Sequence, residues 1–318
     1  MDSHERALTT MALAAYVFPG QGSQYVGMGK DLFAQHAPSR ALMERADRVL
    51  GFPLTAICFE GPVETLRQTM NTQPAIFLHS VALFNATGGR PAMVAGHSLG
   101  EYSALVAAGA LAFEDALRLV RLRGELMQKA GEEHPGTMAA VVGLAPQAVE
   151  EICREASAAG VVQPANLNSP GQIVISGSVA GVRRAMELAK AGGAKMVKEL
   201  VVSGAFHSPL MAGAEAGLRR ALGTTTVLDA RIPVYANVTA EPVQDAAAIR
   251  DLLCRQLTSP VRWEESVHHM VRDGATEFTE VGPGSVLQGL IRRCEPKAGV
   301  SGIDAWSAGA AQEPREAR

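Results

Sequence analysis

The chain has 318 residues, of which 47% are hydrophobic, and its formal net charge is −3. This composition indicates a globular protein and excludes a disordered chain, and the small negative charge argues against general binding to nucleic acid. The length is sufficient for two folding units. The four cysteines are scattered without C-x-x-C spacing, so we expect free thiols in a reducing cytoplasm and neither a disulfide framework nor a metal site.

The two ends of the chain are expected to lie outside the fold. Residues 1–11 lack the positive n-region of a signal peptide and are interpreted as a loose leader. Residues 297–318 are rich in alanine, glycine and charge, so a disordered tail is expected there. The most apolar stretch, 93–113, contains His97 and Glu101 and therefore does not qualify as a membrane span.

The first part of the chain alternates apolar strands with helices. In chain order the predicted elements are a strand at 14–18, a glycine-rich loop at 19–24, helices at 31–35, 39–50, 63–70 and 73–84, a strand at 92–95, and helices at 101–112 and 114–130. Pro74 is expected in the first turn of its helix. Alternation of this kind indicates a parallel sheet covered by helices on both faces.

The middle of the chain has a different order of elements. The predictions are a strand at 137–143, a helix at 146–159, strands at 161–167 and 172–176, a helix at 180–191 and a strand at 195–202. This β-α-β-β-α-β order is that of a ferredoxin-like unit, which we place at residues 134–203.

The α/β pattern resumes after this unit. Its predicted elements are a helix at 209–222, a strand at 234–237, helices at 246–256 and 261–273, a strand at 276–281, and a helix after 282–284. We therefore expect a discontinuous large domain, made of residues 12–133 and 204–296, and a cleft between it and the inserted unit.

The segment Gly96-His97-Ser98-Leu99-Gly100 fits G-x-S-x-G, the strand–turn–helix elbow that exposes a serine nucleophile. Its glycines suit a sharp turn that tolerates little side chain. Ser98 is therefore the predicted nucleophile, and the alternative is a tight turn whose serine only caps the helix. The expected fold class is α/β, with an α/β-hydrolase-like large domain that has a parallel sheet plus an inserted ferredoxin-like small domain.

A serine nucleophile needs a general base, and His207 is the predicted one among eight histidines. It stands where a strand ends and a helix begins, with Ser208 as N-cap and Pro209 at the first helical position. A helix N-terminus disfavours the imidazolium and keeps the ring neutral. The alternative is a histidine that only packs at the domain junction.

Acyl transfer also needs hydrogen-bond donors for the oxyanion of its tetrahedral intermediate. In an elbow, one donor is the backbone N–H of the residue after the serine, here Leu99. The loop Gly20-Gln21-Gly22 is the candidate for the second donor, because glycines let the backbone approach closely. The alternative for this loop is a plain turn at the end of a strand.

Three arginines follow on the next helix: Arg118, Arg121 and Arg123. At 3.6 residues per turn they spread around the helix surface, so at least one can face inward. Spacing alone nevertheless favours a solvated basic stripe.

Several segments resemble, in family order, the malonyl-CoA:acyl carrier protein transacylases of fatty acid synthesis and the related acyltransferases of polyketide synthesis. The matching segments are 17–24, 96–104, 121–124, 166–177, 204–211, 255–263 and 280–284. A single motif of this kind is weak, whereas this many in sequence is highly specific.

The resemblance implies a catalytic arrangement. Ser98 would carry the malonyl group as an ester, and His207 would be its base, oriented by the backbone carbonyl of Gln256 in place of an aspartate. The backbone N–H groups of Gln21 and Leu99 would form the oxyanion hole. The resemblance implies no metal and no redox cofactor.

The resemblance also implies how the substrate is recognised. Arg123 would hold the free malonyl carboxylate with a two-pronged contact, and Gln21 and Asn166 would also lie in the substrate site. Phe206 would favour malonyl over methylmalonyl by occupying the space that an α-methyl group needs, and the alternative is that it only packs under the elbow. The implied partners are malonyl-CoA and a phosphopantetheinylated acyl carrier protein.

Two other functions share many of these features. A serine thioesterase or hydrolase would use Ser98 and His207 with water as acceptor, and an acyltransferase of a polyketide assembly line would differ only in its carrier protein. Carrier proteins of the family are usually acidic, so a basic docking patch is expected on the small domain, with ordinary solvated surface as an equal alternative. The candidates for this patch are Arg183, Arg184, Lys190, Lys195 and Lys198.

Overall fold

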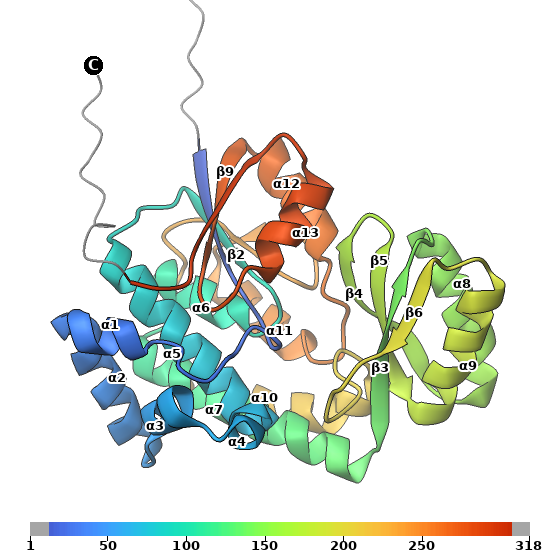
Figure 1. Cartoon of the computed structure of the whole chain (residues 1–318), viewed down its shortest axis with the longest axis horizontal. Coiled ribbons are helices and arrows are strands. Elements are labelled where there is room, and N and C mark those ends of the chain that lie inside the picture. Colours follow the sequence, from blue (N-terminus) through green and yellow to red (C-terminus); the bar gives the residue numbers. More distant parts are fainter. Residues whose placement is uncertain (1–12, 307–318) are drawn as a thin grey trace, which may run out of the picture.

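A six-stranded sheet forms the centre of the larger part of the molecule (Figure 1). The structure, a computed structural model, describes residues 13–306. In sheet order the strands are β10 (Gly299–Ile303), β9 (Ala275–Val281), β1 (Leu13–Phe18), β2 (Met93–Gly96), β7 (Val234–Tyr235) and β8 (Pro242–Val243). All neighbouring pairs are parallel except β7 and β8. The predicted parallel sheet is therefore confirmed.

Alternate residues of each strand supply opposite faces of this sheet. Ala15 and Val17 of β1 belong to a core that they share with α12 (Trp263–Arg272) and α13 (Val286–Cys294). Tyr16 and Phe18 belong to the opposite and larger core. The helices that contribute to this larger core are α1 (Lys30–Gln35), α2 (Ala37–Leu50), α3 (Leu54–Glu60), α4 (Val63–Arg67), α5 (Thr69–Thr87), α6 (Gly100–Ala107), α7 (Phe113–Glu133), α10 (Ala212–Thr224) and α11 (Ala246–Arg255).

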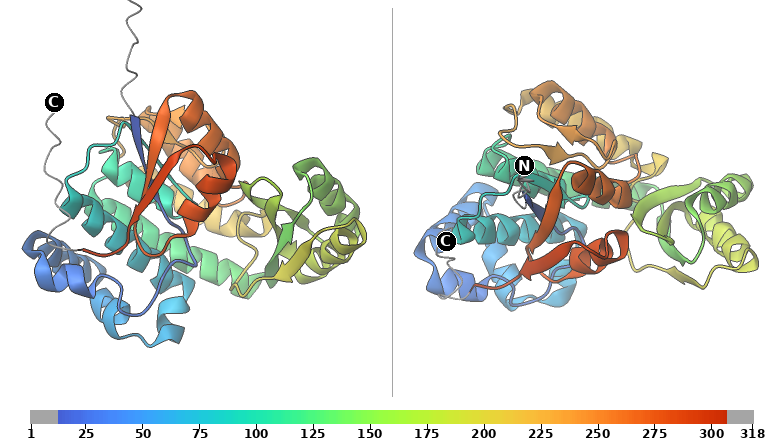
Figure 2. Two further views of the ribbon diagram at one scale, coloured as in Figure 1. Left: turned by 45° about the horizontal axis from the view of Figure 1, so that its top comes forward. Right: turned by 90° about the horizontal axis from the view of Figure 1, so that it is seen from above.

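A separate antiparallel sheet projects from one side of the larger part (Figure 2). Its strands, in sheet order, are β4 (Val162–Ser169), β5 (Gln172–Ser178), β3 (Gly136–Val142) and β6 (Met196–Glu199), and α8 (Pro146–Ala156), the 3-10 turn η1 (Ser157–Ala159) and α9 (Val179–Ala191) connect them. The predicted β-α-β-β-α-β order is confirmed. The domain boundaries at residues 134 and 203 stay a prediction.

The two faces of the small sheet have different neighbours. Ala139 and Val141 pack with α8 and α9 in a core of their own. Met138 and Val174 instead belong to the large core. The small sheet therefore turns one face to its own helices and the other toward the larger part of the molecule, where the serine motif lies.

Helix α5 differs from its prediction. It begins at Thr69, so Pro74 lies inside the helix and not in its first turn. A proline inside a helix leaves the carbonyl four residues earlier without its N–H partner. That carbonyl belongs to Met70, and it accepts a hydrogen bond of 2.9 Å from Nη1 of Arg121. A tertiary contact with α7 thus satisfies the group that the proline leaves free.

The expected disordered tail is wrong for the described part of residues 297–318. Residues Gly299–Ile303 form β10, which pairs in parallel with β9. The edge of β9 supplies hydrogen-bond partners that the composition of the segment does not reveal. The loose leader expected at residues 1–11 lies outside the described residues, as does 307–318. Between residues 13 and 306, no helix combines the length and apolar character needed to cross a membrane.

Candidate active site

Ser98 lies at a tight elbow between β2 and α6, where its φ is 51°. A non-glycine residue in this left-handed region is strained. The glycines beside it are required by close backbone contact. A Cβ on Gly96 would lie 1.9 Å from the carbonyl carbon of Gly100, and a Cβ on Gly100 would lie 2.0 Å from the carbonyl oxygen of Phe18. The chain therefore has the backbone geometry that the G-x-S-x-G motif predicts.

His207 lies within hydrogen-bond distance of this serine. Ser98 Oγ is 2.8 Å from His207 Nε2. On the other side of the ring, Nδ1 is 2.9 Å from the carbonyl oxygen of Gln256 and 3.2 Å from that of Ser259. Because carbonyl oxygens only accept, Nδ1 carries the proton and Nε2 is free to accept the proton of the serine hydroxyl.

The environment of His207 keeps its imidazole neutral. Burial, and next the positive charge of Arg123, lowers the pKa of His207 to about 3. The helix N-terminus invoked from the sequence is only the short 3-10 turn η2 (Pro209–Met211), so burial is the main cause. Of the three non-glycine residues between 13 and 306 with a positive φ, two are Ser98 and His207. Backbone strain thus coincides with the predicted catalytic pair.

One predicted oxyanion donor follows the serine in the chain, and the other lines the same cavity as the serine. Leu99 precedes the first residue of α6, and Gln21 lines the same cavity as Ser98. A hydrogen bond of 3.0 Å from His97 N to the Phe18 carbonyl ties the loop before Gln21 to the elbow. Within residues 13–306, the backbone N–H groups of Gln21 and Leu99 donate no hydrogen bond, so both are free to bind an oxyanion.

Arg123 points into the site from α7 and is fully buried. Its Nη2 lies 3.0 Å from Ser98 Oγ and 2.9 Å from Gln256 Oε1, and its Nη1 lies 2.7 Å from Gln73 Oε1. Its Nε has no hydrogen-bond partner in the described structure. Burial lowers the pKa of this guanidinium. A desolvated cation with a free donor beside the nucleophile is suited to an anionic group of a substrate.

The other two arginines of α7 stay outside the site. Arg118 pairs with Asp115 at 3.3 Å on the exposed surface. Arg121 pairs with Glu125 at 2.5 Å and also contacts α5. The solvated basic stripe favoured by spacing is therefore wrong for Arg123, because the packing of α7 against α5 and the elbow turns that side chain inward.

A cavity of about 140 Å³ opens beside Ser98 and His207. Its wall is mostly apolar and includes Phe206, and Gln21 and Asn166 add polar groups. The other apolar residues of this wall are Met127, Met138, Leu200 and Val202. A second hollow of about 210 Å³ shares four lining residues with the first, namely Gln21, His97, Asn166 and Leu200. The small sheet and the loop after it therefore form one side of the site.

Several polar side chains at the site were not predicted from the sequence. Glu101, Gln73 and Asn237 are all buried there. Glu101 directly follows the serine motif, which is the one local signal that could have found it. Gln73 and Asn237 come from distant segments, and nothing in their own neighbourhoods marks them. His97 turns away from the base, with its Nε2 2.9 Å from Asn168 Oδ1.

A strained serine paired with a neutral histidine, above a parallel sheet and beside an unpaired arginine, is typical of enzymes that transfer acyl groups through a serine ester. The acyl transferase domain family matches residues 15–305, and the chain belongs to this family. A relative from Bacillus subtilis, malonyl CoA-acyl carrier protein transacylase, is 47% identical over 287 residues, which is 89% of this chain and 90% of the relative. The resemblance seen in the motifs is thereby confirmed.

Solved structures agree with this assignment. An acyl carrier protein S-malonyltransferase from Vibrio cholerae has a TM-score of 0.90 and 43% identity, with 93% of this chain and 98% of that chain covered. A malonyl-transacylase solved in complex with a type II polyketide synthase acyl-carrier protein also has a TM-score of 0.90, with 40% identity and coverage of 94% and 98%. The α/β fold with its additional antiparallel sheet is thus the fold of these transacylases.

Proposed function

We propose that the protein transfers a malonyl group from malonyl-CoA to the phosphopantetheine thiol of an acyl carrier protein, through an ester on Ser98. Arg123 is the observation that carries the substrate assignment. Its guanidinium is fully buried 3.0 Å from Ser98 Oγ, and within residues 13–306 no carboxylate touches it directly; the nearby charge of Glu101 acts on it across the Gln256 amide. Burying a cation without a direct ion pair is costly, and a malonyl carboxylate supplies that partner.

The first half of the reaction forms the ester. Ser98 Oγ attacks the thioester carbonyl while its proton moves to His207 Nε2. The N–H groups of Gln21 and Leu99 stabilise the oxyanion, and one such donor contributes about 100- to 1,000-fold in rate. The carbon–sulfur bond then breaks, and the coenzyme A thiolate leaves and takes the proton from His207.

The second half repeats these steps in reverse. The carrier thiol gives its proton to His207, and its sulfur attacks the ester carbonyl. The carbon–oxygen bond breaks and Ser98 recovers the proton. A ping-pong cycle follows, because one serine accepts and returns the same group.

The substrate carboxylate also acts on the base. The charge of Arg123 is one of the causes that lower the pKa of His207. A malonyl carboxylate on Arg123 offsets that charge and raises the pKa of the imidazole toward its ordinary value. His207 therefore becomes a stronger base when the correct acyl group is bound.

The wall of the cavity accounts for selectivity on the other side of the acyl group. Phe206 is buried and lines the cavity beside the catalytic pair. Its ring occupies the room that an α-methyl branch would need, so malonyl is favoured over methylmalonyl.

The carrier protein is proposed to dock beside the small sheet. The five basic candidates on this unit are exposed, although Arg183 lies 3.7 Å from Glu199 and Arg184 lies 3.2 Å from Glu187. The structure of a relative in complex with its acyl-carrier protein supports the kind of partner. A cytoplasmic location belongs to the same proposal, because all four cysteines are buried free thiols.

The test is the intact mass of the protein after brief exposure to malonyl-CoA, measured beside Ser98→Ala. We expect a gain of one malonyl group that is absent in the variant and is discharged by a carrier protein but not by water. Steady release of free malonate without transfer would instead identify a thioester hydrolase, the alternative that shares the same serine and histidine.

A further inference from the structure

Glu101 is a buried carboxyl group that the reaction above does not use. It lies in the first turn of α6, three residues after the nucleophile, and only 3% of it is exposed. Its Oε2 accepts hydrogen bonds from Asn237 N at 2.9 Å and from Gln256 Nε2 at 3.0 Å. Burial raises the pKa of this carboxyl group to about 7. Burying a carboxyl group costs free energy, which suggests that the two hydrogen bonds it accepts serve a function.

The contact between Glu101 and Gln256 orients the side-chain amide of Gln256. The oxygen of this amide accepts from Arg123 Nη2 at 2.9 Å, and its nitrogen donates to Glu101 and to the Ser98 carbonyl at 3.0 Å. A guanidinium can only donate and a carboxylate can only accept. The amide therefore satisfies both neighbours in one orientation and neither neighbour in the flipped one.

Gln256 is also the residue whose backbone carbonyl accepts from His207 Nδ1. One residue thus contacts the base through its backbone and the arginine through its side chain. Glu101 contacts the nitrogen of the Gln256 side-chain amide, and Arg123 contacts its oxygen.

The contact between Glu101 and Asn237 connects Glu101 to the serine elbow. Asn237 Oδ1 accepts from Ser98 N at 2.7 Å, and Asn237 Nδ2 donates to the Gly96 carbonyl at 2.7 Å. Asn237 therefore bridges the end of β2 and Ser98 across the intervening His97. Glu101 in turn fixes the backbone of Asn237 by accepting a hydrogen bond from its N–H group.

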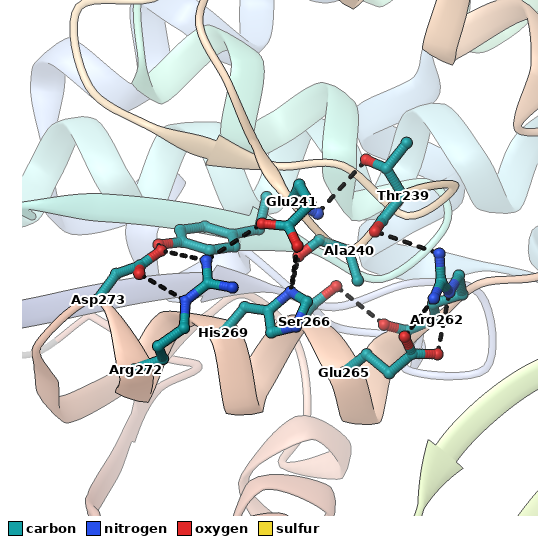
Figure 3. Close-up of polar contacts among 10 residues, drawn as sticks. Thr239, Ala240, Glu241, Arg262, Glu265, Ser266, His269, Arg272 and Asp273 are labelled. Carbon is teal, nitrogen blue, oxygen red and sulfur yellow. Dashed lines mark hydrogen bonds and ion pairs between the residues drawn. The ribbon is translucent and has the colours of Figure 1, made fainter.

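The turn that follows Asn237 is anchored from outside by α12. Figure 3 shows Arg262 reaching the Thr239 carbonyl and His269 reaching the Ala240 carbonyl, at 3.3 Å and 2.9 Å. Arg262 N also donates to the Asn237 carbonyl at 3.0 Å. The outer side of this turn is thus fixed by α12, and its inner side is fixed by Glu101.

We infer that Glu101 is a positioning residue that acts through the Gln256 amide to hold Arg123 in the geometry needed for malonyl transfer. Its contact with Asn237 supports the serine elbow, which serves every acyl group alike. This inference rests on the proposed function. Its effect falls mainly on malonyl, because an acetyl group has no carboxylate to place on Arg123. The charge of Glu101 matters as well as its shape, since only a pure acceptor fixes the Gln256 amide.

The test uses Glu101→Gln, which keeps the shape and one carbonyl oxygen but removes the charge and adds competing donors. The rates of acyl-enzyme formation from malonyl-CoA and acetyl-CoA are measured by rapid quench and intact mass above about pH 8, where Glu101, with a pKa of about 7, is ionised. Hydrogen bonds to charged groups are strong, so we expect the malonyl-to-acetyl rate ratio to fall by about tenfold to a hundredfold. An unchanged ratio overturns the inference, even where both rates decline together.

Glu280→Gln is the matched control. Glu280 is equally buried and accepts from the backbone N–H groups of Leu287 and Gln288 at 3.1 and 3.2 Å, at the start of α13. We expect this variant to lower the midpoint of thermal unfolding without changing the malonyl-to-acetyl ratio. An equal change of the ratio in this control would assign the effect of Glu101→Gln to general loss of a buried carboxylate.

A double-mutant cycle with Gln256→Met tests the route of the effect. If Glu101 acts on Arg123 through the Gln256 amide, Glu101→Gln changes the ratio little in the Gln256→Met background. Full additivity contradicts that route. If Glu101→Gln fails to fold, the malonyl-to-acetyl ratio of Gln256→Met alone tests the inference. An unchanged ratio in that variant would show that the Gln256 amide does not position Arg123, which overturns the inference. Absence of malonylation in the unmodified protein would refute the proposed function itself, a separate result.

Discussion

Replacing Arg123 by alanine is the substitution that most directly tests how the substrate is recognised. In the protein this guanidinium contacts Ser98, Gln256 and Gln73 and lies in the interior. With malonyl-CoA bound, its loss would leave the malonyl carboxylate without a cation in a desolvated site. An acetyl group has no such charge, so its transfer depends on the serine, the base and the oxyanion donors alone.

The magnitude follows from the burial of the group. Removing one partner of a buried ion pair costs about 3–5 kcal/mol, which corresponds to about 100- to 5,000-fold in kcat/KM. We therefore expect Arg123→Ala to lower malonyl transfer by this factor. Acetyl transfer should change much less, and the raised pKa of His207 that follows from loss of the neighbouring charge should favour it.

The assay measures kcat/KM for both thioesters with a carrier protein as acceptor. Arg121→Ala is the control, because Arg121 lies on the same helix but binds the Met70 carbonyl and Glu125 outside the cavity. This control should lower stability without changing the ratio of malonyl to acetyl transfer. The reasoning is refuted if Arg123→Ala lowers both transfers equally, which would give the arginine a structural role only.

Four further outcomes are expected. Ser98→Ala should form no acyl-enzyme, and a labelled variant would place the nucleophile elsewhere. Phe206→Ser should raise methylmalonyl transfer relative to malonyl by enlarging the cavity of about 140 Å³, and an unchanged ratio would locate the gate at another residue. Gly100→Ala should lower both the midpoint of thermal unfolding and activity, because the added Cβ meets a backbone oxygen at 2.0 Å; wild-type behaviour would contradict the elbow packing. With acetyl-CoA, whose acyl group has no carboxylate to place on Arg123, the base should stay neutral down to about pH 3, because burial lowers the pKa of His207. Acyl-enzyme formation from acetyl-CoA at pH 5 should therefore not show the roughly thirtyfold loss expected for a histidine of ordinary pKa.

Local sequence is sufficient to predict most of the serine elbow. Gly96 is needed because its missing side chain leaves room for the backbone of Gly100, only a few residues away. Gly100 leaves room for the Phe18 carbonyl at the end of β1, which is distant in the chain, although the motif that contains both glycines is local. The alternation of strands and helices likewise follows from short-range patterns, so both sheets could be predicted. His207 could be singled out because a strand end followed by a serine cap and a proline is also a local signal.

Only the tertiary structure decided which side chains meet in the site. Arg118, Arg121 and Arg123 are alike in sequence, and the packing of α7 alone turns one of them inward. Gln256 and Asn237 join the elbow from more than a hundred residues away in the chain, through hydrogen bonds that no local pattern encodes. The position of Pro74 inside α5 and the pairing of β10 have the same cause, since distant groups satisfy their backbone. Local sequence therefore determined the elements and the elbow that carries the predicted nucleophile, and long-range packing determined the polar side chains around it.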